Sequence, residues 1–150
     1  MFERFSAFRG KDRPPNCFWA VGDEKINAAE ERLGYQFPSE LSRFFREVGY
    51  GFFTQGHSDT KQTHVNRVLS PKSIAGLLTN EADPGRPAEG FPAGVMPFFD
   101  LGESTYLVLR PTSDQPNRVY WPGGRKAISD SLVEFFDRLY ERADFYRDHV

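Results

Sequence analysis

Two histidines and an aspartate lie close together in one polar stretch of the chain and could serve as metal ligands. His57, Asp59 and His64 would offer two imidazoles and a carboxylate, a donor set that zinc accepts in proteins. The spacing H-x-D-x4-H, however, fits no helix or strand that would hold the three side chains together, and a polar loop collects such residues by chance. A metal-dependent enzyme built on this loop therefore remains only an alternative, and we assign no metal ligand.

Residues for nucleophilic or acid–base catalysis lack their usual partners in this sequence. Cys17 lies between a proline pair and the aromatic residues Phe18 and Trp19, a setting typical of a buried, unreactive thiol. No G-x-S-x-G motif is present, and no two carboxylates stand out as an acid–base couple. The glycines at 49 and 51 lack the third glycine of a dinucleotide-binding motif. The sequence predicts no catalytic residue, no cofactor and no enzyme activity.

Composition narrows the class of protein further. The chain has 150 residues, 27% of them charged and 15% aromatic, which is typical of one folded domain. Its net charge of −2 gives no electrostatic reason to bind nucleic acid or an anionic membrane. A lone cysteine forms no intrachain disulfide, and no apolar run has the length of a signal peptide or a membrane span. We expect a cytoplasmic protein that binds neither nucleic acid nor membrane.

The N-terminal segment mixes aromatic and basic side chains. Phe2, Phe5 and Phe8 recur at every third position, as on one face of a short helix, with arginines between them. Such a mixture can bind single-stranded nucleic acid, but in an acidic chain a helix with buried rings and solvated charges explains it better. We therefore treat residues 1–22 as an N-terminal extension of a single domain spanning residues 1–150.

Two adjacent helices are predicted around Pro38. The first spans residues 23–33 and ends at Gly34, and the second begins with Ser39 as its capping residue. The second helix has one apolar face, because its hydrophobic residues follow the i, i+3, i+4, i+7 spacing: Leu41, Phe44, Phe45 and Val48. The short connection predicts that the two helices pack side by side.

The rest of the chain alternates between short strands, turns and helices. A weak strand at 64–69 precedes a helix that starts at Ser70 and Pro71, and residues 80–94 form the longest predicted loop. A meander of three strands follows at 95–101, 105–110 and 118–121, with Pro97 marking an edge or a bulge. The last element is a helix over residues 131–146, which begins with a capping-box pattern at Ser131 and Glu134. This order predicts the α+β class, with a mostly antiparallel sheet and helices packed on one side.

Aromatic and acidic side chains are the best candidates for a binding surface. The chain has more aromatic residues outside its helices than one small core needs, namely Tyr50, Phe52, Tyr106, Tyr120 and Trp121. Asp100 and Glu103 add negative charge that could meet a basic partner. The alternative is that most of these rings are core residues and that the acidic side chains are simply solvated.

Several motifs, taken in order, resemble the SUKH superfamily. The first group is Ile26, Glu30, Leu33 with Gly34, Phe37 with Pro38, and Phe44 with Phe45. The run MPFFD at 96–100 resembles the family's apolar–proline strand and acidic turn, and YLVL at 106–109 resembles its central strand. Residues 128–136 resemble its closing strand–helix step, so the similarity extends over about residues 26–140.

The resemblance implies a protein-binding domain without catalytic activity. Members include fungal cell-wall assembly regulators and bacterial immunity proteins, so the expected partner is a protein, and in bacteria a toxin domain. A regulatory scaffold that binds resident host proteins is the alternative, and the oligomeric state stays open. We expect the partner to contact Tyr50, Asp100, Tyr106 and Trp121.

Overall fold

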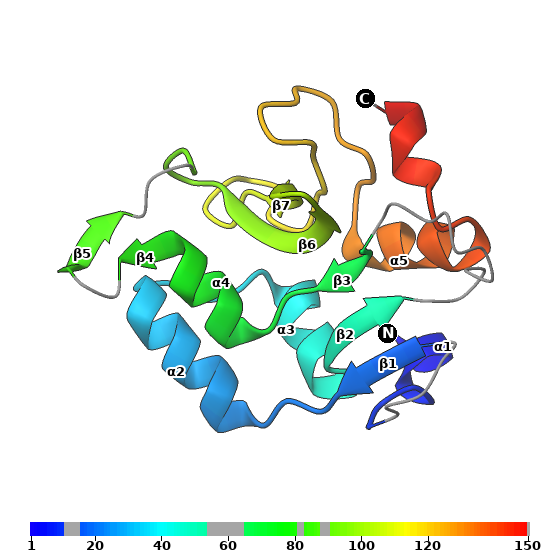
Figure 1. The fold of residues 1–150 in the computed structure, drawn as a ribbon, viewed down its shortest axis with the longest axis horizontal. Helices are drawn as coiled ribbons and strands as arrows, with labels where there is room; N and C mark the ends of the chain where they lie inside the picture. Colours follow the sequence, from blue (N-terminus) through cyan, green and yellow to red (C-terminus); the bar gives the residue numbers. More distant parts are fainter. Residues whose placement is uncertain (11–15, 54–64, 81–82, 88–90, 150) are drawn as a thin grey trace.

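The computed structural model describes residues 1–10, 16–53, 65–80, 83–87 and 91–149 (Figure 1). The helices are α1 (Glu3–Ser6), α2 (Asp23–Leu33), α3 (Ser39–Glu47), α4 (Pro71–Leu78), α5 (Leu132–Glu141) and the 3₁₀ helix η1 (Phe145–His149). The strands are β1 (Asn16–Trp19), β2 (Tyr50–Phe53), β3 (Arg67–Val68), β4 (Thr79–Asn80), β5 (Asp83–Pro87), β6 (Met96–Gly102) and β7 (Thr105–Leu109).

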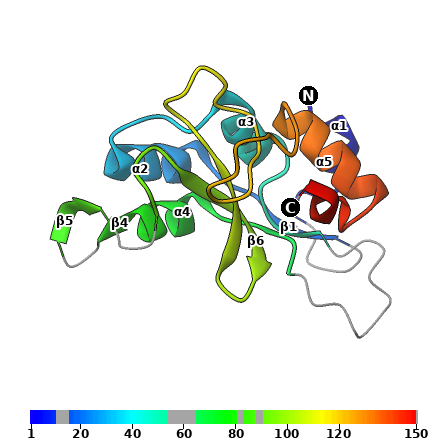
Figure 2. The same ribbon diagram turned by 90° about the horizontal axis from the view of Figure 1, so that it is seen from above.

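Within the described residues, five strands form one antiparallel sheet in the order β1-β2-β3-β6-β7. Helices α1, α3 and α5 cover one face of this sheet, as Figure 2 shows from above, and α2 and α4 lie side by side next to it. On the other face, which we call the open face, outward side chains of all five strands are half-buried or exposed in the described part of the chain. The α+β class, the antiparallel sheet and the packing of helices on one side are therefore confirmed.

Phenylalanine rings join the covering helices to the sheet. Phe44 of α3 and Phe136 of α5 stack with their ring centroids 4.2 Å apart, and Phe136 stacks at 5.4 Å on Phe53 of β2. Phe2 and Phe5 add edge-on contacts to this cluster and are 1% exposed. The N-terminal extension is thus part of the core, and these two rings cannot stack on nucleic-acid bases.

The pairing of β1 with β2 depends on two glycines. A Cβ atom at Gly51 would lie 1.9 Å from the carbonyl oxygen of Cys17, and one at Gly49 would lie 2.0 Å from that of Trp19. Both glycines also have positive φ, +153° and +118°, which side-chain-bearing residues rarely adopt. Only glycine therefore allows the β1 backbone to lie directly against this part of the chain.

Two of the predicted helix starts are confirmed, and the capping role predicted for Ser39 is wrong. Ser70 and Ser131 cap α4 and α5, since their Oγ atoms accept hydrogen bonds from Ser73 N and Glu134 N. Ser39, by contrast, is the first residue of α3 and caps nothing. A residue distant in sequence does so instead, because the amide of Glu40 donates to Asn117 Oδ1 at 3.1 Å.

Three other predictions about the elements were wrong. The predicted loop at 80–94 contains strand β5, which pairs with β4. The third meander strand at 118–121 is reduced to isolated bridges, Val108 with Tyr120 and Val119 with Ser129. The C-terminal helix ends at Glu141, because Arg142 is extended and the chain continues as η1. The bulge predicted at Pro97 is confirmed by a shift of register between Pro97 and Phe99.

A buried polar cluster explains why the last helix stops early. Asn66 is fully buried and has a φ of +46°. Its Nδ2 donates to the carbonyl of Ala143 at 2.9 Å, and its Oδ1 accepts from the hydroxyl of Tyr146 at 2.8 Å. The chain leaves the α-helix to reach these partners, so a tertiary contact overrides the local helical pattern.

We expect Gly51→Ala to destabilise the protein by at least about 3 kcal/mol, because the new methyl group would overlap backbone that cannot move aside. Urea unfolding of the wild type and the variant measures this loss. Gly123→Ala is the matched control, since Gly123 has a φ of +74° but nothing within 4 Å of its Cβ position. Strain alone should cost the control about 1–2 kcal/mol. Equal losses in the two variants would contradict the close approach of β1.

Tyr146→Phe should lower the free energy of unfolding by about 1–3 kcal/mol at pH 7, because Asn66 Oδ1 loses its buried donor. Burial raises the pKa of Tyr146 above its ordinary value of 10.0. The folded state then favours the protonated phenol, so this stabilisation is complete below pH 10 and declines at higher pH, by up to about 1.4 kcal/mol per pH unit. Unfolding measured from pH 7 to 12 should show the wild type losing its advantage over the variant only above pH 10. A constant difference across this range would contradict the assignment.

Candidate functional site

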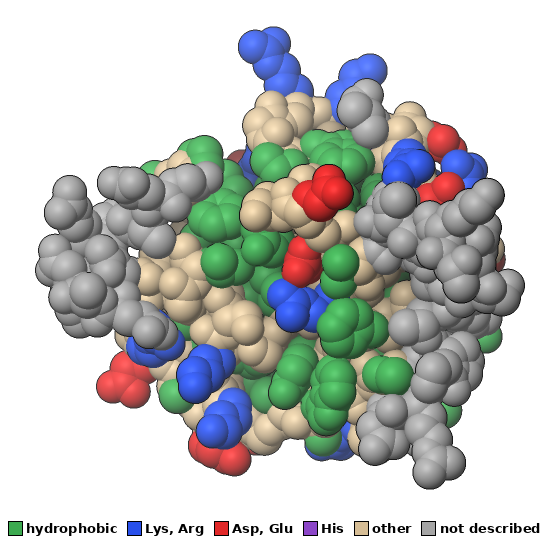
Figure 3. Space-filling view, in the orientation of Figure 1, with side chains coloured by type: hydrophobic (Ala, Val, Ile, Leu, Met, Phe, Trp, Pro, Cys, Tyr) green, Lys and Arg blue, Asp and Glu red, His purple; other side chains and the backbone are tan. Residues whose placement is uncertain are grey.

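The open face of the sheet brings together side chains from all five strands. Because side chains alternate along a strand, Phe18, Phe53 and Val68 point to the helices, while their neighbours point the other way. We define the open face by those neighbours, which are Cys17, Trp19, Tyr50, Phe52, Arg67, Asp100 and Tyr106. Figure 3 shows hydrophobic side chains gathered over the middle of this side of the molecule, with few charged groups among them.

Strand register lines these residues up in a row. Cys17 pairs with Phe52, Phe52 with Arg67, Arg67 with Asp100, and Asp100 with Tyr106. Trp19 pairs with Tyr50 beside this row, and their ring centroids are 5.6 Å apart. Trp19 is 42% exposed, which is unusual for a large apolar side chain on a sheet. The row thus joins an aromatic end at β1 and β2 to Tyr106 at β7.

An ion pair lies at the centre of the open face. Arg67 Nη2 is 2.8 Å from Asp100 Oδ2, and the guanidinium carbon lies 5.9 Å from the centre of the Phe52 ring. The second carboxylate oxygen of Asp100 accepts a hydrogen bond from the amide of Gly102 at 2.8 Å. Both oxygens of Asp100 are therefore engaged within the chain, and they hold the guanidinium in place on the face.

Three of the four residues predicted to contact a partner share the open face. Tyr50 and Tyr106 are half-buried, and their strands lie three spacings of about 4.8 Å apart, roughly 14 Å. Asp100 lies between them. Trp121 lies outside the five strands, where its indole nitrogen donates to the carbonyl of Tyr146 at 3.2 Å and its ring contacts that of Tyr146. The fourth residue is thus placed against η1.

A hollow lies at each end of the open face. The one beside Tyr106 measures about 520 Å³ and is mainly apolar; Phe91 forms one wall, with its ring centroid 5.8 Å from that of Tyr106. The one beside Tyr50 measures about 230 Å³. We call the second the lysine hollow; its lining residues are Ala20, Val21, Lys25, Tyr50, Ser70, Pro71 and Lys72.

The sequence did not reveal three residues of the open face as contacts: Cys17, Trp19 and Arg67. The prediction that Cys17 is buried was wrong, because it is half-buried on this face. The alternation in NCFW and YGFF indicates which residues share a face of each strand, but not that the two strands pair. Arg67 follows the polar stretch that contains the two histidines, and no motif around it indicates a contact residue. Tyr120, a candidate from the sequence, is 6% exposed and lies under the guanidinium of Arg110.

The metal alternative falls on His57, Asp59 and His64, which lie outside the described residues. Within the described part of the chain, no three His, Cys, Asp or Glu side chains are placed to hold a metal ion. Among those same residues, no helix combines the length and the apolar character needed to cross a bilayer.

Comparison with known proteins identifies the family. The chain belongs to the SMI1/KNR4 family (SUKH-1), whose family model matches residues 20–138, and this confirms the resemblance found in the sequence. The chain is also similar to a curated protein named Immunity protein YxxD, from Bacillus subtilis (strain 168). The two are 29% identical over 143 residues, which cover 92% of each chain. No solved structure matches significantly.

Proposed function

We propose that this protein is a bacterial immunity protein that binds a cognate toxin in the cytoplasm and neutralises it without catalysis. The observation that carries the proposal is the open face, where an exposed tryptophan and two further aromatic rings lie beside a central ion pair. Its relative from Bacillus subtilis, which aligns over 92% of this chain, bears the name of an immunity protein.

The physical character of the open face suits a protein partner. Trp19, Tyr50 and Phe52 offer large, rigid rings whose remaining exposed area can be buried at little cost in conformational entropy. Arg67 offers a fixed guanidinium for hydrogen bonds across the interface. Aromatic and arginine side chains of this kind supply most of the binding energy in many protein interfaces.

The size of the open face indicates how far the partner extends. Five strands about 4.8 Å apart span only about 19 Å, and four residues along a strand span about 13 Å. A stable complex buries about 800 Å² on each partner, roughly three times the area that these lengths enclose. The partner therefore reaches beyond the strands to the hollows beside Tyr50 and Tyr106.

The predicted contact residues take different parts in this proposal. Tyr50 and Tyr106 touch the toxin directly, as do Trp19, Phe52 and Arg67. Asp100 acts through Arg67, since both of its oxygens are already engaged. Trp121 contributes at the rim, where it is half-buried against η1.

We expect a toxin domain to be encoded beside this gene, co-expression of the two proteins to restore growth of cells that the toxin otherwise kills, and the purified pair to form a stable complex. Trp19→Ala should weaken the complex at least about tenfold by calorimetry, because it removes the most exposed aromatic ring of the open face. Lys126→Ala, an exposed residue outside the face, is the control and should leave the affinity unchanged.

The thiol of Cys17 provides a second measurement on the same complex. Cys17 is half-buried on the open face, so its reaction with a thiol reagent should slow when the toxin is bound. Absence of a complex, or a complex that leaves the reactivity of Cys17 unchanged, would contradict binding at this face. Stoichiometric binding of a resident host protein in place of any toxin would favour the regulatory-scaffold alternative.

A further inference from the structure

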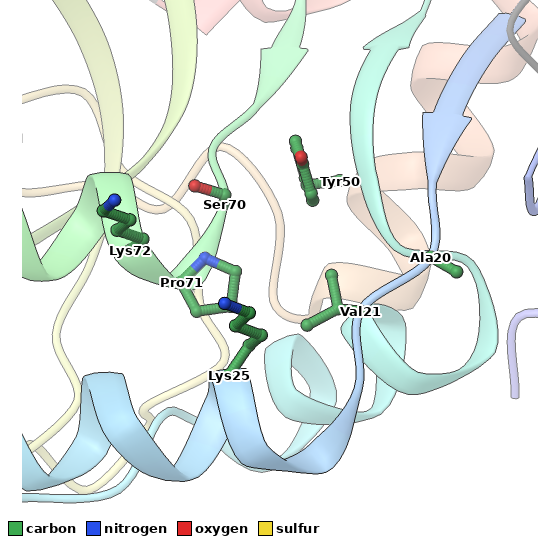
Figure 4. Close-up of a pocket in the computed structure, with 7 residues that line it drawn as sticks. All are labelled: Ala20, Val21, Lys25, Tyr50, Ser70, Pro71 and Lys72. Atoms are coloured by element: carbon green, nitrogen blue, oxygen red, sulfur yellow. The ribbon is translucent and has the colours of Figure 1, made fainter.

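The lysine hollow combines cationic and aromatic walls at the β2 end of the open face. Figure 4 shows Lys25 extending from α2 towards Pro71, with Tyr50 of β2 on the other side of the hollow and Lys72 of α4 at its rim, beyond Ser70 and Pro71. Its volume of about 230 Å³ is below the range of sites that hold whole small molecules, so it fits a single side chain.

The polar side chains on the walls of this hollow offer hydrogen-bond donors. Within the described part of the chain, the ammonium groups of Lys25 and Lys72 and the hydroxyl of Tyr50 have no hydrogen-bond or ion-pair partner. The hydroxyl of Ser70 is already engaged, since it accepts from Ser73 N and donates to Ser73 Oγ. Lys25 and Lys72 are exposed, so their ammonium groups donate to water, and a bound acceptor, in particular a negatively charged one, can replace that water.

The carboxylates of the described chain near the hollow do not neutralise the two lysines. No aspartate or glutamate lines it. Asp23, at the start of α2, pairs with Arg46 at 2.9 Å, and Asp100 is held by Arg67 and Gly102. The carboxylate of Glu24 lies against the backbone of Gly22, outside the lining. The positive charge of Lys25 and Lys72 thus remains unneutralised by the described chain.

We propose that the lysine hollow receives an aspartate or glutamate side chain of the toxin. The carboxylate accepts a hydrogen bond from the hydroxyl of Tyr50 and pairs with Lys25, the flexible side chain of Lys72 turns in from the rim to meet it, and its methylene groups pack on Val21 and Pro71. This inference rests on the proposed function and adds the chemistry of one contact. It makes Lys25 and Lys72 determinants of which toxin is recognised, because a toxin without the acidic residue leaves two desolvated cations unpaired.

The hollow can be tested without the toxin by titrating ¹⁵N-labelled protein with N-acetylglutamate α-amide and, in parallel, with N-acetylglutamine α-amide. We expect saturable shifts of the backbone amides of Lys25, Tyr50 and Lys72 with the glutamate compound alone, weakening as salt is raised. The double variant Lys25→Met, Lys72→Met should lower this affinity at least about tenfold, and Lys126→Met should leave it unchanged. Equal shifts with both compounds, or shifts spread over other lysines, would overturn the proposal.

The cognate toxin expected under the proposed function provides the second test. The Lys25→Met, Lys72→Met double variant should bind the toxin at least about tenfold more weakly. Replacing one aspartate or glutamate of the toxin by asparagine or glutamine should weaken binding to the wild-type protein by the same factor. Combining the toxin substitution with the double variant should cause no further loss of affinity. Unchanged affinity in the double variant would overturn the inference while the proposed function stands. Failure of the wild-type protein to bind the toxin would overturn the proposed function, and with it a toxin as the occupant.

Discussion

The stacking of Phe44 on Phe136 is the contact that joins helices α3 and α5 to each other and to the sheet. These rings belong to α3 and α5, and both contact Phe53, so a single cluster joins two helices to the sheet. Phe5 of α1 and Phe18 of β1 complete it from the N-terminal side. Because this cluster takes up the inward face of β1 and β2, the outward residues of these strands are left to solvent. The open face is therefore a consequence of where the aromatic core lies.

Hydrogen bonds between distant residues fix the orientation of the same helices. Asn117 caps α3 through the amide of Glu40, and the carboxylate of Glu40 in turn accepts from the amide of Val133 in the first turn of α5. The start of each helix thus depends on a residue from another part of the chain. This arrangement keeps the covering layer rigid, which in turn keeps the open face in one shape and lowers the entropic cost of binding.

In the function we propose, the open face and the lysine hollow make different contributions to toxin binding. Aromatic rings at β1 and β2 supply apolar area, and Arg67 supplies directed hydrogen bonds from a position fixed by Asp100. The lysines at the edge add charge that steers and selects the partner. Most of the chain's acidic groups take no part in this surface, so the overall charge of −2 says little about the partner.

Local patterns determined the elements that depend on neighbouring residues alone. The helix at 23–33, the start of α4 at Ser70 and the Ser131–Glu134 cap follow from side-chain spacing and capping chemistry, and the family follows from the order of its motifs. The tertiary structure alone decided that β1 pairs with β2 against Gly51, that Asn66 ends the last helix, and that Trp19 and Arg67 join Tyr50 on one face. The physical reason is that strand register and buried polar contacts link residues far apart in sequence, so no local pattern encodes them.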